Sequence, residues 1–351
     1  MCHRVPRSDG VLAESEALAH LSPVPDPFTL IDASHAGGEP WAEKPTVVVI
    51  GNFDGVHRGH QAVLGEAVAT AREKGLEAAV LTFHPHPGLV LGRGEPPVLT
   101  ALPRRAELIR RLGVARVFVR KFDLEFAKWS PEEFARELVS KGLLAKVVVV
   151  GENFRFGAER AGDLTTLREL GQSMGFEARV HGVARDAGGP FSSTRARQAL
   201  SRGDLEEARA VLGRPHALSG VVAEGDKRGR TIGFSTANLE GVAEVVPPDG
   251  VYAVLVDGIG ADGAAHALAR GVMNIGVRPT IAGEKKRTLE AHLLDFAADL
   301  YGKILRVHLI ARLRDEQRFD GLDALKAQIA RDVLAARALL ADAKTESGAF
   351  G

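Results

Sequence analysis

The chain has 351 residues, enough for two domains of ordinary size, each with its own core. Its 45 basic and 45 acidic residues balance, which argues against a protein that works mainly by coating nucleic acid or an anionic membrane. A single cysteine, Cys2, excludes an intramolecular disulfide, so we expect a reducing, cytoplasmic location. No apolar run approaches the length of a membrane span. The expected ligands are therefore small molecules, and monomer and homo-oligomer both remain open.

Residues 1–44 are rich in Pro, Ala, Gly and charge without a sustained period, which predicts a partly disordered extension with no function assigned to it. From Thr46 onward, short apolar runs alternate with amphipathic segments. Runs such as "VVVI" and "KVVVVG" lack polar alternation, as strands buried on both faces do, and the helices between them complete βαβ units. Residues 45–213 are therefore predicted to form a doubly wound, Rossmann-like parallel sheet.

After Leu218, Gly-punctuated stretches with period-two alternation predict an antiparallel β-barrel or sandwich. A last segment, "LDALKAQIARDVLAARALL", repeats apolar residues at Leu322, Leu325, Ile329 and Val333, and it predicts a helix that packs on the β domain with that face. The second domain should span residues 214–345.

The stretch "GNFDGVHRGHQ", residues 51–61, joins a strand that ends near Ile50 to a helix that begins close to Gly59. Free backbone N–H groups, the positive end of the helix dipole and the imidazoles of His57 and His60 can together stabilise charge on a phosphate. Two other interpretations stay open here. The histidines can be incidental at a helix start, or they can join His84 and His86 around zinc, which we disfavour because no HExxH motif or cysteine cluster accompanies them.

Three other loops carry polar side chains. "TFHPHP" leaves a strand at Phe83, and "GENFRFGAERAGD" leaves another at Gly151, with Asn153 and Arg160 close behind. Ligands of open α/β sheets bind beyond the carboxyl ends of the strands, so these loops should converge with the first. In "SSTRAR", residues 192–197, serine and threonine can cap a helix, while the arginines suit a polyphosphate.

In the second half, "GDKRGRTIGFSTANL" combines glycines and cations with a Thr-Ala-Asn group. Such glycines let backbone N–H groups wrap phosphates, and the oxygens of Thr236 and Asn238 suit Mg²⁺, although a plain hairpin turn is the alternative. Downstream, Glu290 in "TLEAHLLDF" is either a solvated strand carboxylate or a base beside a nucleotide.

These motifs, in this order, resemble the prokaryotic bifunctional riboflavin kinase/FMN adenylyltransferase (FAD synthetase) family. The likeness covers about residues 46 to 340, and "GRPHALSG", "GVYAV", "MNIGVRPTI" and "RLRDEQRF" contribute to it in the second half. The resemblance implies an α/β nucleotidyltransferase domain followed by a six-stranded riboflavin kinase barrel. It also implies riboflavin, FMN and ATP as substrates, Mg²⁺ as the metal, and no zinc, nucleic acid or membrane.

The resemblance assigns residues to two sites. His57 and His60 would stabilise the transition state as the FMN phosphate attacks the α-phosphorus of ATP, and Glu290 would deprotonate the ribityl 5′-hydroxyl. The ATP and FMN site of the first domain would include Gly51, Asn52, Phe53, Asp54, Gly55, Gly59, Asn153, Arg160, Ser193, Thr194 and Arg197. The kinase site would include Gly225, Lys227, Gly229, Thr231, Gly233, Thr236, Asn238, Arg314, Glu316 and Phe319, with Thr236 and Asn238 on Mg²⁺.

Two positions depart from the family pattern. Ser235 replaces the proline of the usual Pro-Thr-Ala-Asn, and His216 stands where an aromatic residue commonly follows Gly-Arg-Pro. Serine does not fix φ as proline does, so the Mg²⁺ ligands are less pre-organised. We expect the kinase to be active, with a rate that serine at this position can lower. The alternative is a monofunctional FMN adenylyltransferase whose second domain binds flavin without phosphorylating it.

Overall fold

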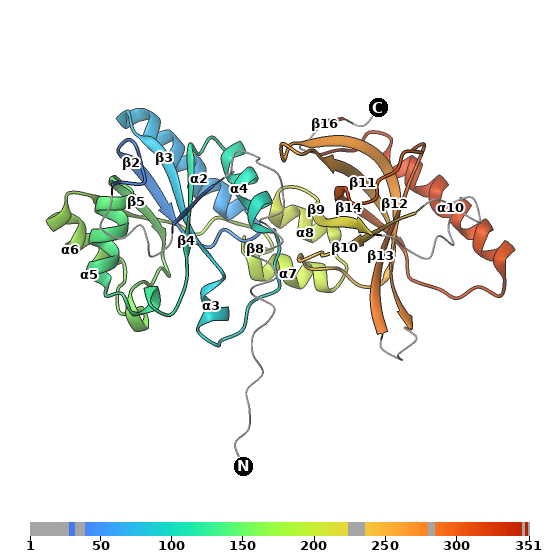
Figure 1. The fold of residues 1–351 in the computed structure, drawn as a ribbon, viewed down its shortest axis with the longest axis horizontal. Coiled ribbons are helices and arrows are strands. Elements are labelled where there is room, and N and C mark those ends of the chain that lie inside the picture. The colour runs from blue at the N-terminus through green and yellow to red at the C-terminus, as the bar shows by residue number, and fades with distance from the viewer. Residues whose placement is uncertain (1–27, 32–38, 224–235, 280–284, 346–347, 350–351) are drawn as a thin grey trace, which may run out of the picture.

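The computed structural model describes residues 28–31, 39–223, 236–279, 285–345 and 348–349, which fold into two parts that lie side by side (Figure 1). A parallel sheet with helices on both faces forms the first part, here called the α/β part. A closed antiparallel barrel with one long helix forms the second, here called the barrel part. Within these described ranges, no helix combines the length and apolar character that crossing a membrane requires.

Six parallel strands form the sheet of the α/β part, in the order β1-β4-β3-β2-β5-β6. They are β1 (Thr29–Ile31), β2 (Thr46–Ile50), β3 (Glu77–His84), β4 (Arg116–Lys121), β5 (Ala145–Gly151) and β6 (Glu177–His181). Alternate residues of β2 enter different cores, since Val48 and Ile50 pack in one cluster and Val47 and Val49 in another. Burial on both faces explains the unbroken valine run, and the predicted doubly wound sheet is confirmed.

Helices cover both faces of this sheet. The helices of the α/β part are α2 (Arg58–Lys74), α3 (Pro87–Val90), α4 (Leu102–Arg111), α5 (Pro131–Glu133), the π-helix η3 (Phe134–Gly142), α6 (Leu164–Met174), α7 (Ser193–Ser201) and α8 (Leu205–Leu212). Short elements between them are the 3-10 turns η2 (Phe126–Lys128) and η4 (Ala158–Arg160) and the strands β7 (Arg185–Asp186) and β8 (Gly189–Pro190). Side chains of α2 and α4 join the cluster of Val47, whereas η3 and α6 join the cluster of Val48.

Part of the segment before Thr46, for which the sequence predicts no element, forms regular structure. Thr29–Ile31 is the edge strand β1, which pairs with β4, and Ile31 is fully buried. The backbone N–H groups of Trp41 and Ala42 both donate to the carbonyl of Gly142. Three residues are too few to show a period, and their partners lie far along the chain, so a local pattern does not reveal this strand.

The barrel part closes in the order β10-β13-β12-β11-β14-β9, which resolves the open choice between barrel and sandwich. Its strands are β9 (His216–Ala223), β10 (Thr236–Glu240), β11 (Gly250–Ile259), β12 (Ala265–Pro279), β13 (Lys285–Leu293) and β14 (Ile304–Arg314). All six ladders are antiparallel. Side chains such as Ala237, Leu239, Leu289 and Ala291 fill the interior, so the residues between them face outward.

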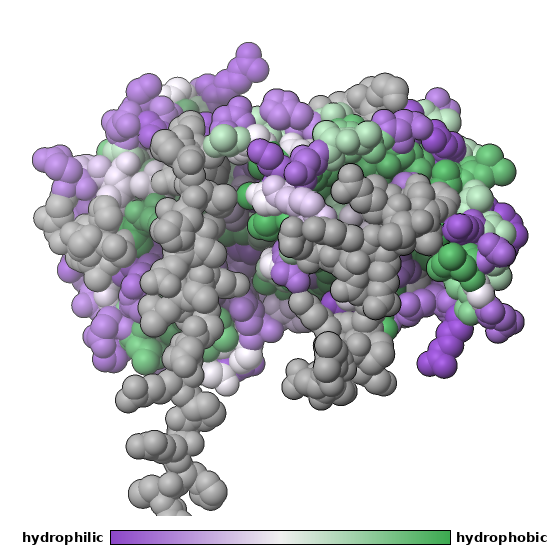
Figure 2. All heavy atoms as spheres, turned by 45° about the vertical axis from the view of Figure 1, so that its right-hand side comes forward, coloured by the Kyte–Doolittle hydropathy of each residue, from purple (hydrophilic) through white to green (hydrophobic). Residues whose placement is uncertain are grey.

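Helix α10 (Leu322–Leu340) covers the outward face of β11, where it packs on Val251, Ala253 and Leu255. The predicted helix is confirmed, but its predicted packing face is wrong in part. Leu322 is 54% exposed, whereas the buried positions are Asp332, Ala336 and Leu340. Val333 of the predicted face packs against the same cluster. An ion pair of 2.8 Å between Asp332 and Arg314 of β14 adds a carboxylate to the buried face. Figure 2 shows hydrophobic residues exposed at this end of the molecule. Leu334 and Leu339 of α10 are 71% and 52% exposed.

The two parts share one hydrophobic cluster. Leu200 of α7 and Leu212 of α8 pack in the same cluster as Leu218 and Leu309 of the barrel. Polar contacts also cross the junction, including an ion pair of 2.9 Å between Arg306 of β14 and Glu107 of α4. The α7–α8 pair therefore connects the parallel sheet to the barrel.

Candidate active sites

The loop between β2 and α2 carries the two predicted histidines and has an unusual backbone. Phe53 has φ 53° and Val56 has φ 40°, both in the left-handed region that non-glycine residues seldom adopt, and Gly55 has φ 85°. Phe53 and Val56 are almost fully buried. Such conformations cost about 1–3 kcal/mol each and persist where surrounding contacts enforce them, which is typical of functional loops.

His57 and His60 form a compact pair at the start of α2. His57 is the N-cap residue, and its Nδ1 accepts a hydrogen bond of 3.3 Å from the backbone N–H of His60. Their rings stack with centroids 3.6 Å apart, and the ring of Phe53 lies 5.1 Å from that of His60. Because Nδ1 of His57 accepts, a neutral ring carries its proton on Nε2. Nε2 of His57 is thus a donor next to the helix N-terminus.

Both imidazoles are held in the neutral form. Burial, followed by the charge of Arg214, lowers the pKa of His57 to about 4. Burial also lowers the pKa of His60 well below its ordinary value, with smaller contributions from His57 and Arg105. Nδ1 of His60 is buried and has no hydrogen-bond partner among the described residues. The pair can therefore bind an anionic oxygen through neutral N–H donors rather than through imidazolium charge.

The glycines of this loop allow close contact with protein atoms. A Cβ on Gly59 would lie 3.1 Å from the ring of His57 and 3.2 Å from the carbonyl oxygen of Phe191. A Cβ on Gly55 would lie 2.9 Å from Leu99. A Cβ on Gly51 would meet the ring of Phe53 at 3.3 Å. The tight packing of the loop itself thus accounts for small residues at these positions.

Asp54 ties the loop to two other segments. Its carboxylate accepts hydrogen bonds from the backbone N–H groups of Leu99 and Thr100 at 3.0–3.1 Å and from Nη2 of Arg197 at 2.6 Å. The hydroxyl of Ser193 donates to the backbone oxygen of Asp54 at 2.8 Å. The structure therefore brings Asp54, Ser193 and Arg197 together, and the hydrogen bonds that join them are internal to the protein. Ser192, the residue before Ser193, caps α7.

The loops after β3 and β5 reach the same edge of the sheet, since β2 lies between these two strands. The amide Nδ2 of Asn52 lies 3.2 Å from Nε2 of His86, which joins the loops after β2 and β3. Asn153 and Arg160, which follow β5, are exposed, as is Thr194 of α7. From β2 the chain continues to β3 on one side of β2, and after β4 it crosses to β5 on the other side. The topological switch point of the sheet therefore lies at the carboxyl end of β2.

Arg105 of α4 is a site residue that the sequence did not indicate. It is 9% exposed, and its guanidinium donates to the backbone oxygens of Asn52 at 3.0 Å and Thr100 at 3.1 Å. It also lies 3.5 Å from the carboxylate of Asp54. The segment "RRAELIRR" has the pattern of a basic, solvated helix, so the burial of one arginine beneath the loop is visible only in the fold.

The second site lies on the outward face of the barrel. Thr236 and Asn238 are two residues apart on β10, and Asn238 pairs in register with Glu290 of β13. Asn274 of β12 pairs with Glu290 from the other side. Neighbouring positions of one face thus carry a hydroxyl, amides and a carboxylate, all hard oxygen donors, and this donor set fits Mg²⁺.

Residues predicted near flavin lie where β14 ends. Arg314 forms its ion pair with Asp332, and its guanidinium lies 5.7 Å from the ring centre of Phe319. The carboxylate of Glu316 lies over Gly276 of β12, and a Cβ at position 276 would clash with it. Gly225, Lys227, Gly229, Thr231, Gly233 and the departure Ser235 lie outside the described residues. Within the described ranges, no group of three or more His, Cys, Asp or Glu side chains is arranged to hold a metal.

Comparisons with known proteins match both parts. A family model described as FAD synthetase matches residues 39–195, and one described as riboflavin kinase matches residues 212–340. The bifunctional riboflavin kinase/FMN adenylyltransferase of Escherichia coli (strain K12) is 44% identical over 292 residues, which cover 83% of this chain and 91% of that protein. The protein of the same name from Bacillus subtilis (strain 168) is 39% identical over 293 residues, 82% of this chain and 90% of that protein.

A solved structure shares the complete two-part arrangement. The crystal structure of a protein named a macrolide-efflux protein, from Streptococcus pneumoniae, has a TM-score of 0.76 and 30% sequence identity to this chain. It covers 88% of this chain and 99% of its own. The α/β part followed by the barrel is therefore a fold that occurs in a determined structure.

Proposed function

This chain belongs to the bifunctional riboflavin kinase/FMN adenylyltransferase family, and we propose that it catalyses both reactions of that name. The barrel part phosphorylates riboflavin to FMN with ATP. The α/β part transfers the adenylyl group of a second ATP to FMN, giving FAD and pyrophosphate. Both products form in the cytoplasm, where ATP is available and Cys2 stays reduced.

The observation that carries the adenylyl transfer is the neutral histidine pair at the switch point of the sheet. An oxygen of the FMN phosphate attacks the α-phosphorus, the bond from that phosphorus to the bridging oxygen breaks, and pyrophosphate leaves. Nε2–H of His57 and the ring of His60 donate to phosphate oxygens whose charge grows in the transition state. No covalent intermediate is needed, so positioning and charge stabilisation supply the rate.

Two groups of residues serve this site. The exposed side chains of Asn153, Arg160 and Thr194 are available to contact the nucleotide. Ser193, Arg197 and Asp54 act by holding the loop, because their hydrogen bonds join α7 to it. Gly51, Asn52, Phe53, Gly55 and Gly59 shape the loop backbone against which the phosphates lie.

Phosphorylation takes place on the outward face of the barrel. Thr236 and Asn238 would hold Mg²⁺, which when bound neutralises charge on the ATP phosphates. Glu290, opposite Asn238, takes the proton of the ribityl 5′-hydroxyl as that oxygen attacks the γ-phosphorus. The bond from the γ-phosphorus to the oxygen that bridges it to the β-phosphate breaks, and ADP leaves. Arg314, Glu316 and Phe319 lie beside the flavin.

A single experiment tests both reactions. The purified chain is incubated with ATP and Mg²⁺ together with either riboflavin or FMN, and riboflavin, FMN and FAD are separated by chromatography. We expect FMN to form first and FAD to follow. FAD formation from added FMN without any phosphorylation of riboflavin would establish the monofunctional alternative, which the match of the riboflavin kinase model disfavours. The absence of both products would refute the proposal.

A further inference from the structure

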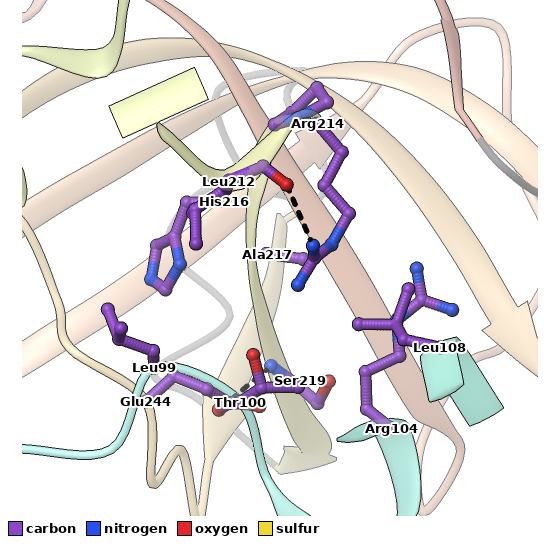
Figure 3. A pocket seen from close by; sticks show the side chains of 11 residues that line it. Leu99, Thr100, Arg104, Leu108, Leu212, Arg214, His216, Ala217, Ser219 and Glu244 are labelled. Atoms are coloured by element: carbon purple, nitrogen blue, oxygen red, sulfur yellow. Dashed lines mark hydrogen bonds between the residues drawn. The ribbon is translucent and has the colours of Figure 1, made fainter. Parts of the chain in front are cut away.

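Arg214 lies between α8 and β9, and its side chain reaches back into the α/β part. Nη2 donates to the backbone oxygen of Gly55 at 2.6 Å, and Nη1 donates to that of Val56 at 3.2 Å. Nη1 also donates to the oxygen of Leu212 at 3.1 Å, the bond drawn in Figure 3. Gly55 and Val56 directly precede His57. A residue at the entry to the barrel thus holds the backbone of the adenylyltransferase loop.

The loop needs such contacts because of its backbone conformation. Val56 is 1% exposed and has φ 40°, which a β-branched residue adopts only when its surroundings enforce it. Nε2 of Gln61 donates to the oxygens of Val56 and Leu212, both at 2.8 Å, so the carbonyl of Val56 has two donors. The left-handed Gly213, with φ 76°, lets the chain pass close to Gln61 before Arg214 turns inward.

The guanidinium also adds charge near the histidines. It is the largest contribution after burial that lowers the pKa of His57, and it lowers the pKa of His60 as well. Asp54 acts in the opposite direction on His57, and Arg197 acts in the same direction as Arg214. The stacked rings therefore stay neutral next to several charged groups.

From these contacts we propose that Arg214 is a positioning residue for adenylyl transfer, which fixes the backbone of Gly55 and Val56 and so places His57 and His60. This inference rests on the proposed function of the α/β part. Arg214 lies on the junction (Figure 3), where it lines a pocket together with Thr100, Arg104 and Ser219. The hydrogen bonds of its side chain to Gly55, Val56 and Leu212 all end on the α/β part, so the barrel reaction should not depend on these bonds.

The test compares Arg214→Met and Arg214→Lys with Arg209→Met, a change of an exposed arginine on α8. For each protein, kcat and KM are measured for FAD formation from FMN and for FMN formation from riboflavin. We expect Arg214→Met to lower kcat for FAD formation about 10- to 100-fold, because small displacements of catalytic groups cost rates of that order. In Arg214→Met, the KM for ATP and the kcat of riboflavin phosphorylation should change less than about threefold. In Arg209→Met, the rates of both reactions should also change less than about threefold.

The pH dependence separates positioning from a general loss of structure. Arg214→Met removes a charge that lowers the pKa of His57, so the acid limb of FAD formation should move to higher pH, whereas Arg214→Lys should keep it in place. An NMR titration of the histidines measures the same shift in the pKa of His57 without an activity assay. Unchanged FAD formation by Arg214→Met would overturn the inference, as would equal losses in both reactions with a lowered Tm. Absence of FAD formation by the unaltered chain would refute the proposed function instead.

Discussion

The two candidate sites are fixed in different ways. In the α/β part, His57 and His60 depend on a loop with left-handed residues, and Asp54 gathers donors from two distant segments to hold that loop. In the barrel part, Asn238 and Glu290 stand on neighbouring strands, and the ladder between β10 and β13 sets their relation directly.

This difference decides which substitutions should matter. A site on strand positions keeps its geometry when a neighbour changes, because backbone hydrogen bonds define the register. A site on a strained loop inherits its geometry from residues such as Leu99, Arg105 and Arg214, which have no direct role in the chemistry. We therefore expect single-residue effects to be local in the barrel part and widely distributed in the α/β part.

The largest effect should follow from Glu290→Gln. This change keeps the size of the side chain and removes the carboxylate that we propose accepts the proton, so the kcat of riboflavin phosphorylation should fall about 10²- to 10⁴-fold. FAD formation from added FMN should stay within about twofold. Initial rates of both reactions, measured separately, provide the comparison.

Asp342→Asn, a change of an exposed carboxylate just after α10, is the matched control and should leave both rates as they are. If Glu290→Gln also slowed adenylyl transfer by an order of magnitude, the two sites would not be independent.

A somewhat smaller effect should follow from His60→Ala. Removing one donor to the developing phosphate charge costs about 10²- to 10³-fold in kcat, and FMN formation from riboflavin should continue. The ring of His57 loses its stacking partner in this variant, so the circular dichroism spectrum and Tm are needed alongside the rates. A full rate of FAD formation would show that the histidine pair is not the catalytic centre.

A change in metal dependence should follow from Asn238→Ala. One hard oxygen donor is lost from the face that carries Thr236 and Glu290, so we expect about tenfold more Mg²⁺ for half-maximal phosphorylation at fixed ATP, while saturating Mg²⁺ restores part of the rate. Titration of Mg²⁺ against the initial rate measures this. An unchanged Mg²⁺ requirement would show that Asn238 of β10 does not bind the metal.

Much of the architecture follows from the sequence because its signals are local. The valine runs predict buried strands, and "LDALKAQIARDVLAARALL" coincides with α10. The strand β1 and the buried position of Asp332 on α10 were missed because both depend on partners far along the chain, β4 for the first and Arg314 for the second. Long-range pairs of this kind leave no period in the sequence.

The residues of the candidate sites also divide into those that a local pattern predicts and those that depend on partners far along the chain. The glycine-rich turn and the helix start place His57 and His60. The resemblance assigns Gly55 and Gly59 to the ATP and FMN site, whereas in the structure protein atoms lie against both positions. Buried Arg105 could not be distinguished by residue type from the exposed Arg110 and Arg111 of the same helix. Hydrogen bonds between segments, rather than residue type, define these roles.

The smallest expected effect concerns His216, which borders both parts. It is 3% exposed, its Nε2 lies 2.8 Å from the backbone oxygen of Val245, and burial lowers its pKa to about 4. In an unfolded chain its pKa returns to about 6.5, so the unfolded state binds the proton first as the pH falls. The stability that the neutral ring contributes is complete above about pH 6.5 and is lost as the pH falls toward 4.

We therefore expect His216→Phe to change the pH dependence of the free energy of unfolding. At pH 7 the variant should be about 1 kcal/mol less stable, because the hydrogen bond to Val245 is lost. Between pH 7 and pH 5 it should lose about 2 kcal/mol less than the unaltered chain, since no proton is taken up at this position on unfolding. Urea unfolding at both pH values measures the difference, with His266→Gln, an exposed histidine, as control. Parallel losses in the variant and the unaltered chain would mean that His216 is already protonated in the folded protein at pH 5, and the buried junction would then be open to water.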